Sequence, residues 1–180
     1  RAWDQGDAVF PLDQRLPATA KAAMIDAIAP TLVHDGIDDT RVDGRPVEPG
    51  DAVVVATSGS SGLPKGVILT HDAVGASAVA VHRRLGVTAD DAWFACLPPA
   101  HIGGLSVVLR GLVTGARTIV ADGFSVDAYD RAAVNGCTLV SLVPTALRRV
   151  DPSKYRTIVL GGSRPPVDRP ANCVATYGMT

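Results

Sequence analysis

One short stretch carries most of the residues that could bind a phosphate group. Between Ala56 and Val67 the sequence reads Thr-Ser-Gly-Ser-Ser-Gly-Leu-Pro-Lys-Gly. Its hydroxyl groups can donate to phosphate oxygens, its lysine can offset their charge, and its glycines let backbone N–H groups approach an anion. The residues with this chemistry are Thr57, Ser58, Gly59, Ser60, Ser61, Gly62 and Lys65. The stretch therefore predicts a phosphate-binding loop.

Two other interpretations of this stretch are disfavoured. A Walker A loop needs Gly and Lys side by side, followed by Ser or Thr, whereas here Pro64 precedes Lys65 and Gly66 follows it. A flexible Gly/Ser linker would not sit between a valine-rich run and a second apolar run at 67–69. A P-loop ATPase or kinase is therefore not expected.

The elements that must position this loop alternate between strands and helices. Apolar, β-branched runs predict strands, and most of them are apolar without alternation, which is typical of a parallel sheet covered by helices on both faces. The predicted strands are Leu32–Val33, Asp51–Ala56, Ala92–Leu97, Thr118–Ala121, Thr138–Val143, Thr157–Leu160 and Cys173–Thr176. The fold class is therefore α/β, with a mainly parallel sheet.

Four helices are predicted from hydrophobic period and capping residues. They run from an N-cap at Thr19 to before Pro30, from His71 (capped by Thr70) to Leu85, from about Gly104 to Val113, and from after Ser125 to near Asn135. The polar segment 35–50 lacks periodicity and is expected to be a surface loop. It would join a lead-in unit, 1–34, to a nucleotide-binding sheet over 51–180.

At these residues a family becomes recognisable. The stretch from Thr57 to Gly66 closely resembles the signature loop of the adenylate-forming superfamily, which includes acyl-CoA synthetases, adenylation domains of peptide synthetases and luciferases. Other stretches resemble motifs of the same family in the same order. They are Gly6–Asp13 with Arg15–Pro17, Leu97–Leu105, Thr157–Ser163 and Thr176–Thr180.

The resemblance implies roles for individual residues. The hydroxyls of the loop and Lys65 would hold the pyrophosphate end of ATP, and Thr180 would meet the α-phosphate, so Lys65 and Thr180 are the catalytic candidates. Gly161, Gly162 and Ser163 would pass along the adenine, and Tyr177 would stack on it; a plain strand-to-loop turn is the alternative for the first three. His101 would border the substrate acid, or cap the helix that follows it.

The activity implied by the resemblance is ligation of an acid to a thiol. A carboxylate attacks the α-phosphate of ATP, releasing pyrophosphate, and coenzyme A then displaces AMP to form a thioester. Any metal should be Mg²⁺ carried by the nucleotide, with no metal site supplied by the protein. Both ends of the sequence look cut, and the family's C-terminal lid domain is absent, so this piece of the N-terminal domain is expected to be inactive or impaired.

The acid is expected to lack an α-amino group, because His101 is followed by Ile-Gly-Gly and not by the aspartate usual in amino-acid-activating domains. The compact spacing and Pro98–Gly104 look most like the o-succinylbenzoate-CoA ligases of menaquinone synthesis. Two alternatives stay open: a generic aromatic or fatty acyl-CoA synthetase, and a non-catalytic nucleotide-binding module.

Composition excludes several other classes. With 17 basic and 18 acidic residues the net charge is -1, so no global field favours nucleic acid, and no apolar run has the length of a membrane span. Three separated cysteines, Cys96, Cys137 and Cys173, predict reduced thiols in a cytoplasmic protein. The remaining histidines, His34, His71 and His82, show no metal-ligand spacing and are interpreted as surface or capping residues. A homodimer is left open.

Overall fold

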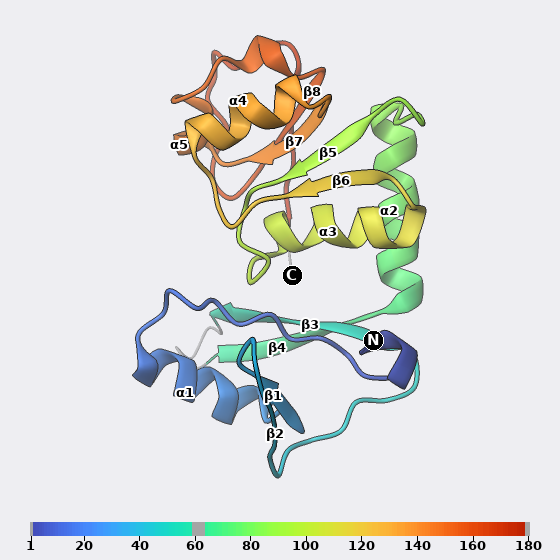
Figure 1. The fold of residues 1–180 in the computed structure, drawn as a ribbon, viewed down its shortest axis with the longest axis vertical. Helices are drawn as coiled ribbons and strands as arrows, with labels where there is room; N and C mark the ends of the chain where they lie inside the picture. The colour runs from blue at the N-terminus through green and yellow to red at the C-terminus, as the bar shows by residue number, and fades with distance from the viewer. Residues whose placement is uncertain (1, 59–63, 179–180) are drawn as a thin grey trace. The chain divides into compact units, whose positions relative to one another are not determined.

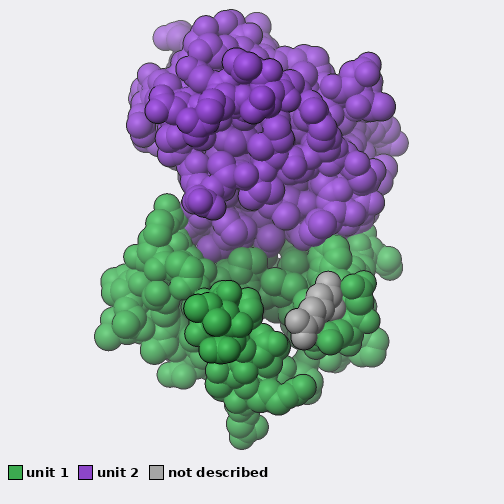
Figure 2. All heavy atoms as spheres, in the orientation of Figure 1, with its two compact units in different colours: residues 1–73, 180 green, residues 74–179 purple. Residues whose placement is uncertain are grey.

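The computed structural model describes residues 2–58 and 64–178, and the chain divides into two compact units. Residues up to 73 form the first unit, and residues from 74 onward form the second (Figure 2). Among the described residues, strands pair only within their own unit. The two units therefore fold around separate sheets.

The first unit contains two small antiparallel sheets (Figure 1). β1 (Leu32–His34) pairs with β2 (Asp39–Arg41), and β3 (Asp51–Ser58) pairs with β4 (Pro64–Thr70). The helix α1 (Ala18–Ile28) packs against β4, and a 3-10 helix covers Trp3–Gln5. The indole N–H of Trp3 donates to the carbonyl of Ala52, at 2.9 Å, which ties the start of the chain to β3.

The prediction that the strand beginning at Asp51 belongs to the parallel sheet is wrong, because β3 forms an antiparallel pair with β4. Its apolar character has a different cause. Val53 and Val54 point to opposite faces of β3, and both are buried. A strand whose successive side chains are all buried resembles a central strand of a parallel sheet in its sequence, so hydrophobicity alone could not distinguish the two.

Helix α1 differs from the prediction at its N-terminus and agrees with it at its C-terminus. The N-cap residue is Pro17, which makes no side-chain capping hydrogen bond. Thr19, the predicted N-cap, lies inside the helix. Pro17 has an extended ψ of 150 that starts the helix without a hydroxyl cap. The helix ends before Pro30 as predicted, with Ala29 in a left-handed conformation.

The segment 35–50, predicted to be a surface loop, contains a strand and makes hydrogen bonds to the C-terminal end of α1. It contains β2, and the backbone N–H of Arg45 donates to the carbonyl of Ala29 at 2.7 Å. The Arg45 guanidinium donates to the carbonyl of Ala27 at 2.9 Å. These two bonds satisfy carbonyls that a helix C-terminus leaves without intrahelical partners.

The second unit is built on a five-stranded parallel sheet with strand order β6-β5-β7-β8-β9. Its strands are β5 (Ala92–Ala95), β6 (Arg117–Val120), β7 (Leu139–Leu142), β8 (Thr157–Leu160) and β9 (Cys173–Ala175). Its helices are α2 (His71–Leu85), α3 (Ile102–Thr114), α4 (Val126–Val134), the short α5 (Pro144–Leu147) and a 3-10 helix, Pro152–Lys154. The hydroxyls of Thr70 and Ser125 accept N–H groups at the starts of α2 and α4, which confirms both predicted caps.

Side chains of this sheet alternate between two covered faces, which confirms the α/β fold class. Phe94 and its neighbours on one face pack with Tyr129 of α4, whereas Trp93 and its neighbours on the other pack with Val107 of α3. Figure 1 shows α3 and α4 on opposite sides of the sheet. All three cysteines are free and buried, as predicted.

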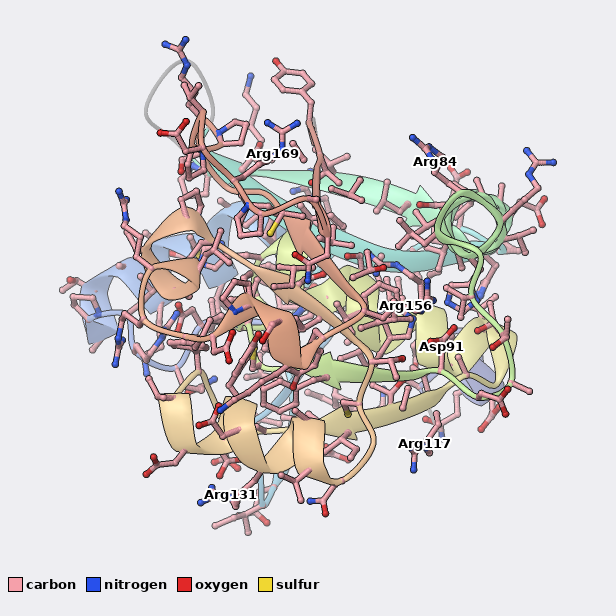
Figure 3. All side chains as sticks on the ribbon, turned by 90° about the horizontal axis from the view of Figure 1, so that it is seen from above. Arg84, Asp91, Arg117, Arg131, Arg156 and Arg169 are labelled. Atoms are coloured by element: carbon pink, nitrogen blue, oxygen red, sulfur yellow. The ribbon has the colours of Figure 1, made fainter. Side chains whose placement is uncertain are left out.

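A partly buried ion pair lies at the amino ends of the strands. The carboxylate of Asp91, which is only 6% exposed, accepts from Nε of Arg156 at 3.0 Å and from its Nη2 at 2.7 Å (Figure 3). Thr138 donates to the same carboxylate at 2.6 Å. Burial alone would raise the pKa of Asp91, but the hydrogen bonds from Arg156 and Thr138 outweigh it and lower the pKa to about 2. The charged pair therefore persists across the neutral range.

Gly66 shows that one glycine of the predicted phosphate loop is needed for packing. It lies in β4 opposite Ala56, and it is not among the described glycines with positive φ. A Cβ at this position would lie 2.7 Å from Cδ1 of Ile28 and 2.8 Å from Cγ1 of Val54. A side chain here would displace Ile28 or Val54, so the close approach of α1 to the β3–β4 pair favours glycine.

We expect Gly66→Ala to lower the free energy of unfolding of the first unit by about 1–3 kcal/mol, because the added methyl group overpacks the contact with Ile28. Urea denaturation measures this. A matched control is Gly75→Ala in α2, where a Cβ meets nothing within 4 Å; this change should be neutral or stabilising. Equal stability of Gly66→Ala and the wild type would show that the contact is not tight.

Candidate nucleotide and substrate site

The carboxyl ends of four parallel strands bring the predicted site residues of the second unit to one edge of the sheet. The segments that leave this edge are 96–101 after β5, 143–145 after β7, 161–163 after β8 and 176–178 after β9. Open parallel α/β sheets bind ligands outside the carboxyl ends of their strands. The edge is therefore the place where these segments can act together.

The Gly161-Gly162 turn is wedged between the ends of β7 and β9. The N–H of Gly161 donates to the carbonyl of Leu142 at 3.1 Å, and the N–H of Thr176 donates to the carbonyl of Leu160 at 2.9 Å. A Cβ on Gly161 would lie 3.0 Å from the hydroxyl of Thr176. A Cβ at Gly161 would therefore be tight against Thr176, which favours glycine at this position.

Gly162 needs to be glycine for a second reason. Its φ is +82°, a conformation that residues with a side chain rarely adopt, and a Cβ would meet Cγ1 of Val143 at 3.0 Å. Ser163 follows the turn and is exposed. The structure therefore shows a strand-to-loop turn whose conformation favours glycine at position 162.

Tyr177 comes two residues after β9 and is 88% exposed. β8 and β9 are paired neighbours, so the segment that carries Tyr177 leaves the sheet beside the Gly161-Gly162 turn. An aromatic ring needs an open π face to stack on a base. Tyr177 has that open face.

His101 is the N-cap residue of α3. Its carbonyl accepts the N–H groups of Gly104, at 3.0 Å, and Leu105, at 2.9 Å, and its side chain makes no capping hydrogen bond. A Cβ on Gly104 would lie 2.3 Å from the carbonyl oxygen of Pro98, so the preceding turn packs directly on the helix start. His101 caps through its backbone, and its exposed imidazole stays a substrate-site candidate.

The described part of the predicted phosphate loop lies in the first unit. Thr57 and Lys65 are cross-strand neighbours in β3 and β4, and the hydroxyl of Thr57 donates to the carbonyl of Lys65 at 3.4 Å. Lys65 is exposed. Ser58 is the last residue of β3. The predicted residues outside the described ranges are Gly59, Ser60, Ser61, Gly62 and Thr180.

Arg110 is a buried charge of the second unit that no motif in the sequence indicated. It lies on α3 and is only 7% exposed, and Cζ is 4.5 Å from the centroid of the Trp93 ring. Nη2 donates to the hydroxyl of Ser106 at 2.8 Å, whereas Nη1 is buried without a hydrogen-bond partner among the described residues. Burial lowers the pKa of Arg110 to about 10, so the group is still a cation at neutral pH. In the sequence, the feature that could have indicated it is a single charged residue within the otherwise uncharged helix α3.

His82 is half-buried, and its ring has a core partner that the interpretation as a surface or capping residue did not include. The indole N–H of Trp93 donates to Nε2 of His82 at 3.2 Å, and the two rings are nearly parallel, at 13°. Burial, followed by the neighbouring Arg110 cation, lowers the pKa of His82, and Asp91 opposes this shift. His82 is therefore a partner of a core tryptophan. His34 and His71 are exposed, as predicted.

The described residues contain no group of three or more His, Cys, Asp and Glu side chains that could hold a metal ion. None of the described helices combines the length and the apolar character needed to cross a bilayer.

The carboxyl edge of the parallel sheet thus carries a glycine turn and an exposed tyrosine. The sequence profile of the family described as AMP-binding enzyme matches residues 3–180. The chain belongs to this family.

Among relatives, a 2-succinylbenzoate–CoA ligase from Bacillus anthracis (strain A0248) is 36% identical over 143 residues, which cover 71% of this chain and 30% of that protein. O-succinylbenzoate coenzyme A synthetase (MenE) from Bacillus subtilis, solved in complex with ATP and magnesium ion, is 31% identical with a TM-score of 0.59; the match covers 71% of this chain and 30% of that chain. Wild-type E. coli MenE with a bound analogue of OSB-AMS is 26% identical with a TM-score of 0.73, covering 96% of this chain and 44% of that chain. The chain thus spans about 30% of the length of the curated relatives it matches.

We expect Gly162→Ala to lower the free energy of unfolding of the second unit by about 1–2 kcal/mol, because alanine pays for the left-handed conformation and also meets Val143. The measurement is urea denaturation followed by Trp93 fluorescence in a Trp3→Phe background. Gly123→Ala is the matched control, since a Cβ there meets nothing within 4 Å and its φ is not positive. If both variants unfold at the same urea concentration, the turn is not conformationally fixed.

Proposed function

We propose that the full-length protein is an acid–thiol ligase that activates a carboxylic acid with ATP and transfers the acyl group to coenzyme A. The observation that carries the proposal is the Gly161-Gly162 turn, which leaves little room for side chains at the carboxyl edge of the sheet beside the exposed Tyr177. Family membership and the names of the relatives support the same activity. The chain would form part of the N-terminal, AMP-binding domain of such an enzyme.

The proposed roles follow from the chemistry of each group. The Gly161-Gly162 turn and Ser163 would lie along the adenine and Tyr177 would stack on it, while Lys65 and the hydroxyls of 57–61 would bind the terminal phosphates. Thr180 would donate to the α-phosphate, and His101 would border the acid. Mg²⁺ would arrive with the nucleotide, because its preferred ligands are phosphate oxygens and water.

The reaction needs positioning more than acid–base chemistry. An oxygen of the substrate carboxylate forms a bond to the α-phosphorus of ATP as the bond to pyrophosphate breaks. The sulfur of coenzyme A then bonds to the acyl carbon, AMP leaves, and the thiol loses its proton. Charge neutralisation by Lys65 would stabilise the phosphorus transition state without a protein nucleophile.

The acid is proposed to be a dicarboxylate of the 2-succinylbenzoate type. The relatives at 36% identity are named for this acid, which has one carboxyl group to activate and a second that stays free. Arg110 supplies a buried cation with an unused N–H group and no acidic partner among the described residues. A guanidinium in this state is suited to a carboxylate. A generic aromatic or fatty acyl-CoA synthetase is the second candidate.

A cytoplasmic location accompanies the proposal. Cys96, Cys137 and Cys173 are free thiols in the core, as is usual where the compartment keeps thiols reduced. Burial raises the pKa of Cys96 to about 12, so its thiol is not a nucleophile in this chemistry.

The full-length gene product should form acyl-AMP from ATP and 2-succinylbenzoate in a panel that also contains benzoates and fatty acids, detected by mass spectrometry. Lys65→Ala should lower kcat/KM about 10–100-fold through loss of a charge-assisted bond. Tyr177→Ala should raise the KM for ATP about 5–100-fold through loss of stacking. Lys21→Ala is the control lysine. If no acid reacts while ATP still binds, the protein is a nucleotide-binding module; if another acid is preferred, the second candidate stands.

Arg110→Met should weaken selection for the second carboxylate. For the wild type we expect kcat/KM for the dicarboxylate to exceed that for its mono-amide by about 10–100-fold, because a buried cation discriminates strongly against a neutral group. Arg110→Met should bring the ratio close to one, whereas the equivalent change at Arg131, an exposed residue of α4, should leave it unchanged. An unaltered ratio in Arg110→Met would remove Arg110 from the acid site.

A further inference from the structure

We propose that His82 and Trp93 are positioning residues that hold the Arg110 guanidinium in place for the second carboxylate of the acid. The inference rests on the proposed function, since it assigns a purpose to the same cation. It concerns three residues from three elements of the second unit: α2, β5 and α3.

The guanidinium of Arg110 is held on two sides. Its planar group lies over the Trp93 ring, with Cζ 4.5 Å from the centroid, and Nη2 donates to the hydroxyl of Ser106 at 2.8 Å. Nη1 has no hydrogen-bond partner among the described residues. A long, flexible side chain keeps one orientation only if the surfaces around it are fixed, so the Trp93 ring determines where Nη1 lies.

The Trp93 ring is in turn oriented by His82. Trp93 is fully buried, and its indole N–H donates to Nε2 of His82 at 3.2 Å. An indole nitrogen can only donate, so Nε2 must accept and the proton of the neutral imidazole must sit on Nδ1. The bond therefore exists only with neutral His82, and it sets the rotation of the ring on which Arg110 lies.

Burial, followed by the Arg110 cation, lowers the pKa of His82 and favours its neutral form near pH 7. Arg110 faces it from α3, and Asp91 faces it from the start of β5, but the Asp91 carboxylate is already bound by Arg156 of the loop before β8. Arg83 and Arg84 flank it on its own helix. Burial and the Arg110 cation both lower the pKa of His82, which favours the accepting form.

A merely structural role makes a different prediction from a positioning role. If the Trp93–His82 bond served only the core, removing it would lower stability and affect every acid equally. If the bond positions Arg110, removing it would affect an acid with a second carboxylate and spare the same acid with that group converted to an amide. His82→Gln offers a side-chain carbonyl as a replacement acceptor that does not titrate, whereas His82→Leu offers none.

The experiment is a double-mutant cycle on the full-length gene product. We expect His82→Leu to raise the KM for the dicarboxylate about fivefold to tenfold with little change in kcat, and to leave the KM for the mono-amide close to the wild-type value. His82→Gln should restore most of the loss. In an Arg110→Met background, His82→Leu should have no further effect on either acid. Equal effects on both acids, or a persisting effect without Arg110, would overturn the proposal.

A binding measurement separates this inference from the proposed activity. The given sequence has 2 tryptophans, Trp3 and Trp93, so Trp93 reports alone in a full-length background where Trp3 and any tryptophan outside residues 1–180 are replaced by Phe. The dicarboxylate should change Trp93 emission, the mono-amide should not, and Arg110→Met should abolish the change, while His82→Leu should shift the titration midpoint to higher concentration. If this pattern holds and no acyl-AMP forms, the activity is wrong and the positioning stands. If acyl-AMP forms without any response of Trp93, the positioning is wrong.

Discussion

The alternation of side chains across five parallel strands is the constraint on which the second unit depends. Because successive residues point to opposite faces, Trp93 and Phe94 belong to different cores although they are adjacent in sequence. The Phe94 face is closed by α4 and by Tyr129 and Tyr155, whose hydroxyls both donate to backbone carbonyls. The face under α3 is different. It carries Arg110, and by alternation with Val140 and Leu142 it also carries Ser141, and each of these two residues has a buried polar atom without a partner among the described residues.

Local features of the fold could be predicted from the sequence. The strands of the parallel sheet follow from short apolar runs, and the caps at Thr70 and Ser125 follow from hydroxyl residues placed before helical patterns. The errors arose where tertiary context decides. Thr19 was not the cap because Pro17 starts α1. β3 is not part of the parallel sheet, because it pairs with β4 in the antiparallel direction. An apolar run does not specify the direction of the strand that pairs with it.

Some residues of the candidate site could likewise be predicted from the sequence, and others could not. The motif residues Gly161, Gly162 and Tyr177 follow strands, and the pairing of β8 with β9 brings their segments together, so the sequence contained enough to group them. The contacts of Arg110 with Trp93 and of Trp93 with His82 join residues of α2, β5 and α3, and their spacing follows no motif. Composition also could not separate glycines that face a ligand from those that allow packing. Gly66 is of the second kind, although it lies in the signature loop.

Two arginines of the second unit, Arg156 beside Asp91 and Arg110 beside Trp93, differ in how their charge is balanced. Arg156 is 42% exposed, is paired with Asp91 and donates to the Leu85 carbonyl, so its charge is balanced within the fold. Arg110 is more deeply buried, packs on an aromatic ring and donates to a hydroxyl, and has no carboxylate partner among the described residues. Leaving a buried cation unpaired costs stability, and an apolar residue of similar volume would avoid that cost. Arg110 lies on the α3 face without a carboxylate partner, and the Trp93 ring beneath it is bonded to His82. A ligand therefore explains the placement of this cation better than the stability of the fold does.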